Sequence, residues 1–327
     1  MGKSRERLRR HEDGDLVERV LRATGARGFE LGTRLQAVWG GYGELWRGQL
    51  STESVTASVI VKDVRPPNDD GSLSHRRKLR SYRVEQSFYA RFAALLDDRA
   101  RVAKALALSS TQGTFLTVLE DLEQAGFSTR GRMTATEVRC SLDWLAAFHA
   151  TFLGAAPDDL WKVGTYWHLG TRPDELSRLR PGPLRAGAAA IDQRLNAARF
   201  RTFVHGDAKP DNICFARDGR AAFVDFQYVG GGVGVKDVAY LLSCCVPPKQ
   251  SESALPPYLD HYFAALRSAL EPKLGPHDRA ALEHEWRELF PVAWVDFYRC
   301  LQGWAPGQYD PEPFSDALVR QVLGVSR

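Results

Sequence analysis

The sequence predicts an α+β fold with a small antiparallel sheet in the first part of the chain and a larger, mainly helical second part. Two observations carry this prediction. Short runs of strand-forming residues, separated by turn signals, occupy the chain as far as residue 119. Beyond residue 134, apolar residues recur at the three- and four-residue spacing of helices. A chain of 327 residues is long enough for both parts.

Composition and charge exclude several classes of protein. Hydrophobic residues make up 44% of the chain and charged residues 26%, which is ordinary for a soluble protein, and the net charge of +4 gives no reason to expect a nucleic-acid partner. The sequence contains neither a run of about eighteen apolar residues nor an apolar signal segment, so we expect no membrane contact and no secretion. The five cysteines lack CxxC spacing and are expected to be free thiols. We therefore expect a cytoplasmic protein, a monomer or a homodimer, whose basic residues 1–12 form a flexible, solvated arm.

The first part of the chain predicts strands around a glycine-rich hairpin. Strands are expected at Leu31–Val38, Leu45–Leu50, Ser54–Val64, Val102–Leu108 and Thr114–Leu119. A loop rich in Pro, Asn, Asp and Gly at Pro66–Ser72 precedes a helix expected from Ser74 to Leu96. Four glycines cluster around the first hairpin, namely Gly40, Gly41, Gly43 and Gly48.

The second part of the chain predicts helices on either side of a short hairpin. A helix is expected from Thr134 to Phe152, with Thr134 or Thr136 as its N-cap, because apolar residues recur along one face. Residues 154–185 are rich in Pro, Gly, Trp and Arg and are expected to form a loop or insertion with short helices. Helices are expected again towards the C-terminus.

The most informative stretch is VHGDAKPDNICF at residues 204–215, followed by DFQ at residues 225–227. Strands expected at 213–216 and 221–224, around an Asp-Gly turn, would form a β-hairpin that brings Asn212 and Asp225 to the same end. Oxygen ligands of this kind suit Mg²⁺. Asp207, five residues before Asn212, could orient and deprotonate an attacking hydroxyl group. The spacing therefore predicts a site for phosphoryl transfer.

This pattern resembles the aminoglycoside phosphotransferase and choline kinase superfamily, and most closely its ecdysteroid kinase-like (CHK kinase-like) branch. The resemblance extends from about Val38 to Trp304. It implies a protein-kinase-like bilobal fold, with an N-terminal nucleotide-binding lobe at residues 1–119, a hinge at 120–124 and a C-terminal catalytic and substrate lobe at 125–327. It also implies a phosphotransferase that uses ATP and Mg²⁺ and has an alcohol group as acceptor.

The resemblance assigns nucleotide-binding roles to the first part of the chain. The hairpin with Gly41 and Gly43 would cover the triphosphate. It departs from the GxGxxG motif of protein kinases, because the third glycine, Gly48, lies further along the chain than that motif places it. The backbone at Glu120 and Leu122 matches the hinge that contacts adenine in the family.

A lysine and a glutamate are expected to form an ion pair. Lys62, in the third expected strand, matches the lysine that binds the α- and β-phosphates in the family. Glu85 shares a helical face with Phe88 and Phe92, so it points inward, where a carboxylate requires a partner. The alternatives are a lysine that reaches solvent and a glutamate at the edge of an amphipathic helix.

The resemblance also gives roles around the catalytic stretch. Asp207 is the implied catalytic residue, and Asn212 and Asp225 are the implied metal ligands. Lys209 repeats the Asp-x-Lys-Pro spacing of protein serine/threonine kinases, so it would contact the transferred phosphoryl group unless it is a solvated loop lysine. Asp211 is expected to face away.

Two further residues are expected to support the site. His205 is interpreted as a structural residue that hydrogen-bonds the loop backbone. Asp237 stands where the family has an aspartate at a helix start, and it would cap that helix or hold the catalytic loop.

The acceptor is expected to be a small molecule, because only residues 226–236 separate Asp225 from Asp237 and no Ala-Pro-Glu motif follows. The pocket candidates are Trp161, Tyr166, Trp167, His168, Trp294, Asp296, Phe297, Tyr298 and Trp304. Several of the late residues fall on one apolar helix face and are better explained as core. Asp296 and Arg299 lie off that face and would meet the acceptor or solvent. The aromatic character favours a bulky apolar alcohol over a polycationic aminoglycoside.

Two alternative functions remain. An atypical protein kinase is disfavoured by the short segment after Asp225. A nucleotide-binding pseudokinase is disfavoured because all five expected motif residues are present, namely Lys62, Glu85, Asp207, Asn212 and Asp225.

Overall fold

The computed structural model describes residues 14–111, 113–129, 131–307 and 312–325, so the predicted flexible arm lies outside the described residues. The chain divides into two compact units. The first contains the residues up to Ala94 together with Ala103–Phe127, and the second contains Leu95–Val102 together with the chain from Ser128 onward.

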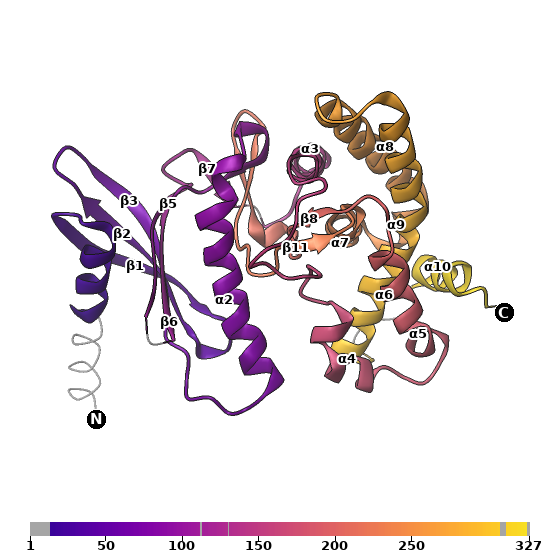
Figure 1. The fold of residues 1–327 in the computed structure, drawn as a ribbon, viewed down its shortest axis with the longest axis horizontal. Coiled ribbons are helices and arrows are strands. Elements are labelled where there is room, and N and C mark those ends of the chain that lie inside the picture. Colours follow the sequence, from indigo (N-terminus) through magenta and orange to yellow (C-terminus); the bar gives the residue numbers. More distant parts are fainter. Residues whose placement is uncertain (1–13, 112, 130, 308–311, 326–327) are drawn as a thin grey trace. The chain divides into compact units, whose positions relative to one another are not determined.

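The first unit is built on a five-stranded antiparallel sheet (Figure 1). Its strands are β1 (Gly28–Val38), β2 (Gly43–Ser51), β3 (Thr56–Val64), β5 (Ala105–Thr111) and β6 (Thr114–Glu120). Their order is β1-β2-β3-β6-β5. A short 3-10 turn, η1 (Trp39–Gly41), connects the first two strands.

Alternation along β3 explains how this sheet packs on both faces. Val59 and Val61 pack with Leu16 and Val20 from a helix at residues 14–24. Val64 lies on the opposite face and packs with side chains that include Tyr82, from α2 (Leu73–Arg91). Because side chains of a strand alternate between faces, Lys62 shares the face that α2 covers.

Two predicted elements of this region differ in the structure. The helix expected from Ser74 to Leu96 ends at Arg91, with Phe92 as its C-cap (φ −119°), and short 3-10 turns follow, η2 (Ala93–Leu95) and η3 (Asp98–Ala100). The strand expected at Val102–Leu108 is divided. Its first part is β4 (Arg101–Val102), which pairs with a strand of the second unit, so only β5 joins the sheet of the first unit.

The second unit contains two small sheets. One has the order β4-β10-β9-β7, with β7 (Phe127–Thr129), β9 (Ile213–Ala216) and β10 (Ala221–Phe223). The other pairs β8 (Thr202–Val204) antiparallel with β11 (Gly230–Gly232). The expected hairpin at 213–224 is therefore present, with Gly219 in the left-handed region (φ 90°) as its turn.

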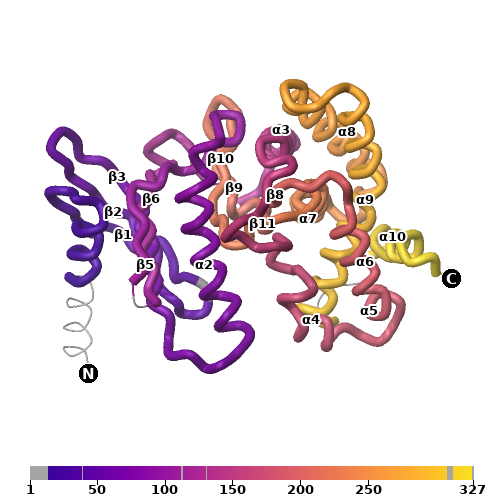
Figure 2. The backbone as a smooth tube through the Cα atoms, in the orientation of Figure 1, coloured from indigo at the N-terminus to yellow at the C-terminus, as the bar shows by residue number. Residues whose placement is uncertain are grey.

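Helices make up most of the second unit (Figure 2). They are α3 (Ala135–Thr151), α4 (Pro173–Arg178), α5 (Pro183–Ala186), α6 (Ala188–Asn196), α7 (Val235–Cys245), α8 (Ser251–Leu270), α9 (Pro276–Trp304) and α10 (Pro313–Leu323), with 3-10 turns η4 (Leu169–Thr171), η5 (Pro210–Asn212) and η6 (Pro248–Gln250). The long α9 packs against α4, α6, α7, α8 and α10. Thr134 caps α3 in a capping box with Glu137, which decides between the two predicted N-caps.

The predicted fold class is confirmed: an antiparallel sheet forms the N-terminal part and helices dominate the C-terminal part. All five cysteines are free thiols, as expected. Among the described residues, no helix is both long and apolar enough to cross a membrane.

Candidate functional site: a phosphoryl-transfer centre

The hairpin of β9 and β10 brings two predicted metal ligands to one end. Asn212 directly precedes β9, and Asp225 follows β10 by two residues. The N–H of Val224 donates to the main-chain oxygen of Asn212 at 3.0 Å, so the strand pairing extends to the residue next to Asp225. Asp225 adopts a positive φ of 67°, which aspartate tolerates better than most residues.

Asn212 is bonded directly to the predicted catalytic residue. Its side-chain amide donates to the main-chain oxygen of Asp207 at 2.9 Å and to Asp207 Oδ2 at 3.0 Å. A side-chain amide has two N–H donors, so this arrangement uses both and leaves Oδ1 of Asn212 as its acceptor atom. That oxygen and the Asp225 carboxylate are hard donors of the kind that Mg²⁺ prefers, so the residues fit the expected ion.

The Asp207 carboxylate is buried and held from both sides. Lys209 Nζ lies 3.3 Å from Oδ2, and the hydroxyl of Tyr240, on α7, donates to Oδ1 at 3.3 Å. Burial raises the pKa of Asp207 to about 6, although the Lys209 ammonium opposes the shift. At neutral pH the carboxylate is therefore mostly ionised and able to accept a proton.

A buried network fixes the backbone before Asp207. The carboxylate of Asp237 accepts from the N–H groups of His205 (2.6 Å) and Gly206 (2.9 Å). His149 Nε2 lies 3.1 Å from the same carboxylate, and its Nδ1 lies 2.8 Å from the hydroxyl of Tyr262. Asp237 thus holds the loop at residues 205–209, the predicted catalytic loop, which was one of its two predicted roles. The N-cap of α7 is Gly234, without a side-chain cap.

His205 is structural, as expected. Its Nδ1 accepts from the N–H of Asp207 at 3.2 Å, so Nε2 carries the proton that is donated to the oxygen of Val224 at 3.1 Å. Burial lowers the pKa of His205, which favours this neutral form.

Glycine is required at Gly206 because its φ is +82° and because a Cβ there would lie 2.2 Å from the oxygen of Tyr228. The segment after Asp225 therefore packs directly on the catalytic loop. Within this segment, Gly230–Gly232 are paired with β8, which holds the segment against the second unit.

The first unit contains the predicted ion pair. Lys62 Nζ lies 2.7 Å from Glu85 Oε2, and both side chains are largely buried. This confirms the expected pairing, because β3 and α2 present the two side chains to each other. Gly41 has a φ of +74° with open space around it, whereas a Cβ at Gly43 would lie 2.0 Å from the oxygen of Asp63. Packing against β3 therefore requires glycine at residue 43, whether or not the turn binds a nucleotide.

The predicted hinge is braced by Asp121. Its carboxylate accepts from Ser58 at 2.6 Å and lies 2.8 Å from Arg47 Nε. The N–H of Glu120 donates to the oxygen of Lys104, and the oxygen of Leu122 accepts from the N–H of Phe127. The N–H of Glu120 and the oxygen of Leu122 are therefore used within the protein, and the N–H of Leu122 is one backbone group to test for adenine contact.

The model of the phosphotransferase enzyme family matches residues 54–277, which is more than half of the chain and includes the Asp207–Asn212–Asp225 site. The chain belongs to this family. The predicted enzyme class, a phosphotransferase, is thereby confirmed. The match is to the family as a whole, so the ecdysteroid kinase-like branch stays a prediction. Comparison with curated protein sequences gave no match.

Solved structures similar to this phosphotransferase include a macrolide 2'-phosphotransferase, MphH, from Brachybacterium faecium, with 16% identity, a TM-score of 0.48, and coverage of 96% of this chain and 98% of that chain. An ethanolamine kinase from Plasmodium vivax has 13% identity and a TM-score of 0.49, with 91% and 82% covered. The choline kinase LicA from Streptococcus pneumoniae has 13% identity and a TM-score of 0.46, with 90% and 93% covered.

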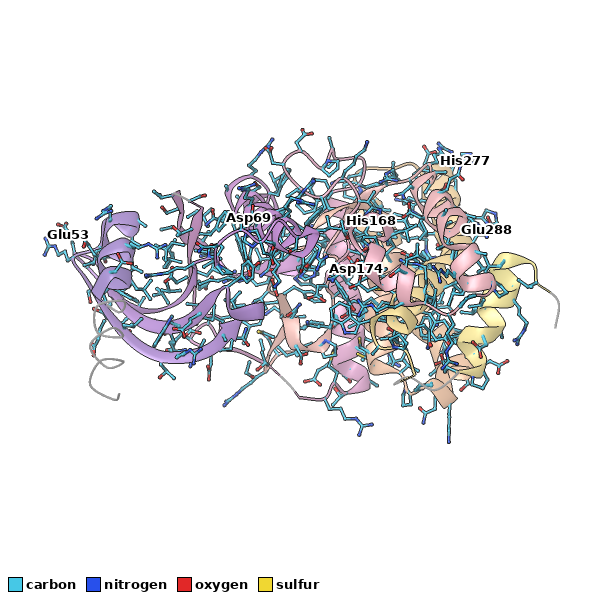
Figure 3. The ribbon with its side chains drawn as sticks, turned by 90° about the horizontal axis from the view of Figure 1, so that it is seen from below. Glu53, Asp69, His168, Asp174, His277 and Glu288 are labelled. Carbon is cyan, nitrogen blue, oxygen red and sulfur yellow. The ribbon has the colours of Figure 1, made fainter. Side chains whose placement is uncertain are left out.

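The structure does not bring all the predicted acceptor residues of the phosphotransferase to Asp207. Tyr166 lies near the catalytic loop: its N–H donates to the oxygen of Gly206 at 3.0 Å, and its ring centroid is 5.5 Å from that of Tyr240. Trp294 and Tyr298 instead bond to residues of α10 and belong to the core. His168, labelled in Figure 3, lies 3.4 Å from Asp192 of α6.

The expectation that Asp296 and Arg299 meet the acceptor or solvent is wrong. Their side chains are 1% and 0% exposed, and Arg299 Nη2 lies 3.0 Å from Asp296 Oδ1. The other oxygen of Asp296 accepts from the indole of Trp167 at 3.1 Å and lies 3.5 Å from Lys236 Nζ. Because Asp296 has its partners, Arg299, Lys236 and Trp167, inside the unit, these side chains form a buried structural cluster.

Two residues of the site were not predicted from the sequence. Tyr240 could have been found from its position three residues after Asp237, which places both on the same side of α7. His149 was signalled only by being a polar residue in an otherwise apolar stretch of α3.

Proposed function

We propose that this phosphotransferase transfers the γ-phosphoryl group of Mg·ATP to a hydroxyl group of a small organic acceptor. The observation that carries the proposal is the buried carboxylate of Asp207, bonded to Asn212 at one end of the hairpin that leads to Asp225. In this proposal Asp207 orients the acceptor hydroxyl and accepts its proton, so the reaction depends mainly on positioning.

The remaining roles follow from charge. Oδ1 of Asn212 and the carboxylate of Asp225 would hold Mg²⁺, which neutralises charge on the phosphates. Lys209, 3.3 Å from Asp207 Oδ2, would contact the transferred phosphoryl group as a point charge.

Lys62, held by Glu85, would bind the α- and β-phosphates of the nucleotide. The turn with Gly41 and Gly43 would cover those phosphates, and the backbone at Glu120 and Leu122 would contact adenine.

A small acceptor is favoured because the segment after Asp225 is short and partly taken up by its pairing with β8. The few remaining residues of this segment are too short to form a docking surface for a peptide. The ring of Tyr166 lies within contact distance of the rings of Tyr228 and Tyr240, and Tyr240 bonds Asp207, which supports an acceptor with an apolar body. An acceptor of this kind would also agree with the ecdysteroid kinase-like branch. We further propose that the enzyme is cytoplasmic, a monomer or homodimer, and has no nucleic-acid or membrane partner.

A panel of small alcohols tests this function. The enzyme is incubated with Mg·ATP and each alcohol, ATP consumption is followed, and products are identified by mass. The proposal predicts a product heavier by one phosphoryl group, with Asp225→Ala as the inactive control. Repeating the assay with GTP identifies the donor. Nucleotide binding without turnover would favour the pseudokinase, and phosphorylation of proteins alone would favour the atypical protein kinase.

A further inference from the structure

A second lysine lies at the glycine-rich turn of the first unit. Lys78, on α2, has its Nζ 4.2 Å from the centroid of the Tyr42 ring. A Cβ on Gly40, which has a φ of +72°, would lie 2.5 Å from the same Nζ. The ammonium group therefore lies directly against the backbone of the turn that connects β1 and β2.

The charges of the two lysines are compensated differently. Lys62 is paired with Glu85 at 2.7 Å. Lys78 takes part in none of the ion pairs formed among the described residues, although the charge of Asp70 acts on it. Burial lowers the pKa of Lys78, and the nearby Arg77 lowers it further, so a cation without a carboxylate partner is unfavourable there. An anion at the turn would remove this cost.

The helix places Lys78 on the side that carries the established ion pair. Lys78, Tyr82 and Glu85 occur at positions i, i+4 and i+7 of α2, which share one face. Tyr82 contacts the surroundings of both lysines: its ring is 6.3 Å from that of Tyr42, and Lys62 Nζ is 5.9 Å from its centroid. The loop that leads into α2 carries Asp69, labelled in Figure 3, and Asp70, whose charge raises the pKa of Lys78 against the effect of burial.

We propose that Lys78 binds the polyphosphate chain of the nucleotide at the glycine-rich turn, as a second cation beside Lys62. This inference rests on the proposed function, because it requires a nucleotide at the first unit. Tyr42 would hold the ammonium in place by its ring, and the absence of a side chain at Gly40 would let the ammonium and the phosphates approach the same backbone.

The test compares ADP with adenosine. Dissociation constants of both ligands are measured by calorimetry for wild type, Lys78→Met and Lys78→Arg, with Mg²⁺ present. Loss of a charge-assisted contact should weaken ADP binding by roughly tenfold or more in Lys78→Met, leave adenosine binding unchanged, and be largely reversed in Lys78→Arg. Arg76→Met is the matched control, because it removes a cation from an exposed position of the same helix.

The outcomes separate this inference from the proposed function. If wild type binds ADP and Lys78→Met binds it equally well, the role of Lys78 is wrong while the proposed function stands. Equal weakening of ADP and adenosine would overturn the inference in favour of a bracing contact with Tyr42. Failure of wild type to bind any adenine nucleotide would contradict the proposed function itself. If Lys78→Met does not fold, ADP and adenosine binding are compared in Lys78→Gln, with the same expected results.

Discussion

The side-chain amide of Asn212 donates to both the main-chain oxygen and the carboxylate of Asp207, at 2.9 and 3.0 Å. These two bonds fix the orientation of the amide, since each of its N–H groups faces an oxygen. A proposed metal ligand and the proposed catalytic carboxylate are therefore one rigid unit, and a change in either residue should affect the other.

Asn212→Asp replaces the side-chain NH₂ group with a carboxylate oxygen. This oxygen would face the main-chain oxygen and Oδ2 of Asp207, which now accept hydrogen bonds. Repulsion should displace the Asp207 carboxylate, and we expect kcat to fall by roughly 10²-fold or more, as for loss of other preorganised groups. Steady-state kinetics with a magnesium titration measures this. Asn196→Asp is the matched control, since the amide of Asn196 bonds only the main-chain oxygen of Asp192 on α6. Equal activity of the two variants would contradict the coupling.

Tyr240→Phe removes only the hydroxyl group that holds Oδ1 of Asp207. Because a hydrogen bond to a charged group is typically worth about 1.5–3 kcal/mol, we expect kcat to fall roughly tenfold, with nucleotide affinity unchanged. Tyr298→Phe removes a comparable bond to Asp316, away from the site, and should retain full activity. A normal kcat in Tyr240→Phe would show that Asn212 and Lys209 alone position the carboxylate.

Asp225→Ala should abolish Mg²⁺-dependent turnover with only a small loss of stability, because it removes a half-buried ligand and no core volume, although alanine tolerates the φ of 67° less well than aspartate. The expected loss is at least roughly 10²–10³ in rate, measured alongside the melting temperature. Asp211→Ala changes an exposed aspartate next to the other proposed ligand and should have little effect. Retained turnover at an unchanged melting temperature would reject the assignment of Asp225.

Asp237→Ala should destabilise the second unit. It leaves the N–H groups of His205 and Gly206 and the ring of His149 without their buried acceptor, which we expect to cost roughly 3 kcal/mol or more. Urea unfolding measures the free energy. The surface pair of Asp143 with His261 is the matched control, and Asp143→Ala should cost about 1 kcal/mol or less. Similar losses in both variants would contradict the role of the buried network.

Local patterns made much of the fold and site predictable. The hairpin at 213–223 and the N-cap at Thr134 depend on residues close in sequence; the hairpin was predicted correctly, and Thr134 was one of the two predicted N-caps. The pairing of Lys62 with Glu85 followed from one strand and the next helix.

The features that were missed depend on distant contacts. The strand expected at Val102–Leu108 is split because its first residues pair with β10, more than one hundred residues later. Asp296 is buried because Lys236 and Trp167, from other elements, complete its interactions. The contact of Tyr240 with Asp207 likewise requires the tertiary structure, since periodicity alone shows only that α7 is apolar.

The most direct test of the account is Asp207→Asn, assayed with the acceptor that the alcohol panel identifies. Nucleotide titration and steady-state turnover are measured on the same preparations. If Asp207 orients and deprotonates the acceptor hydroxyl, kcat should fall strongly while Mg·ATP affinity stays nearly unchanged, because the interaction is made mainly in the transition state and the metal ligands remain. Near-wild-type turnover by Asp207→Asn would contradict the account.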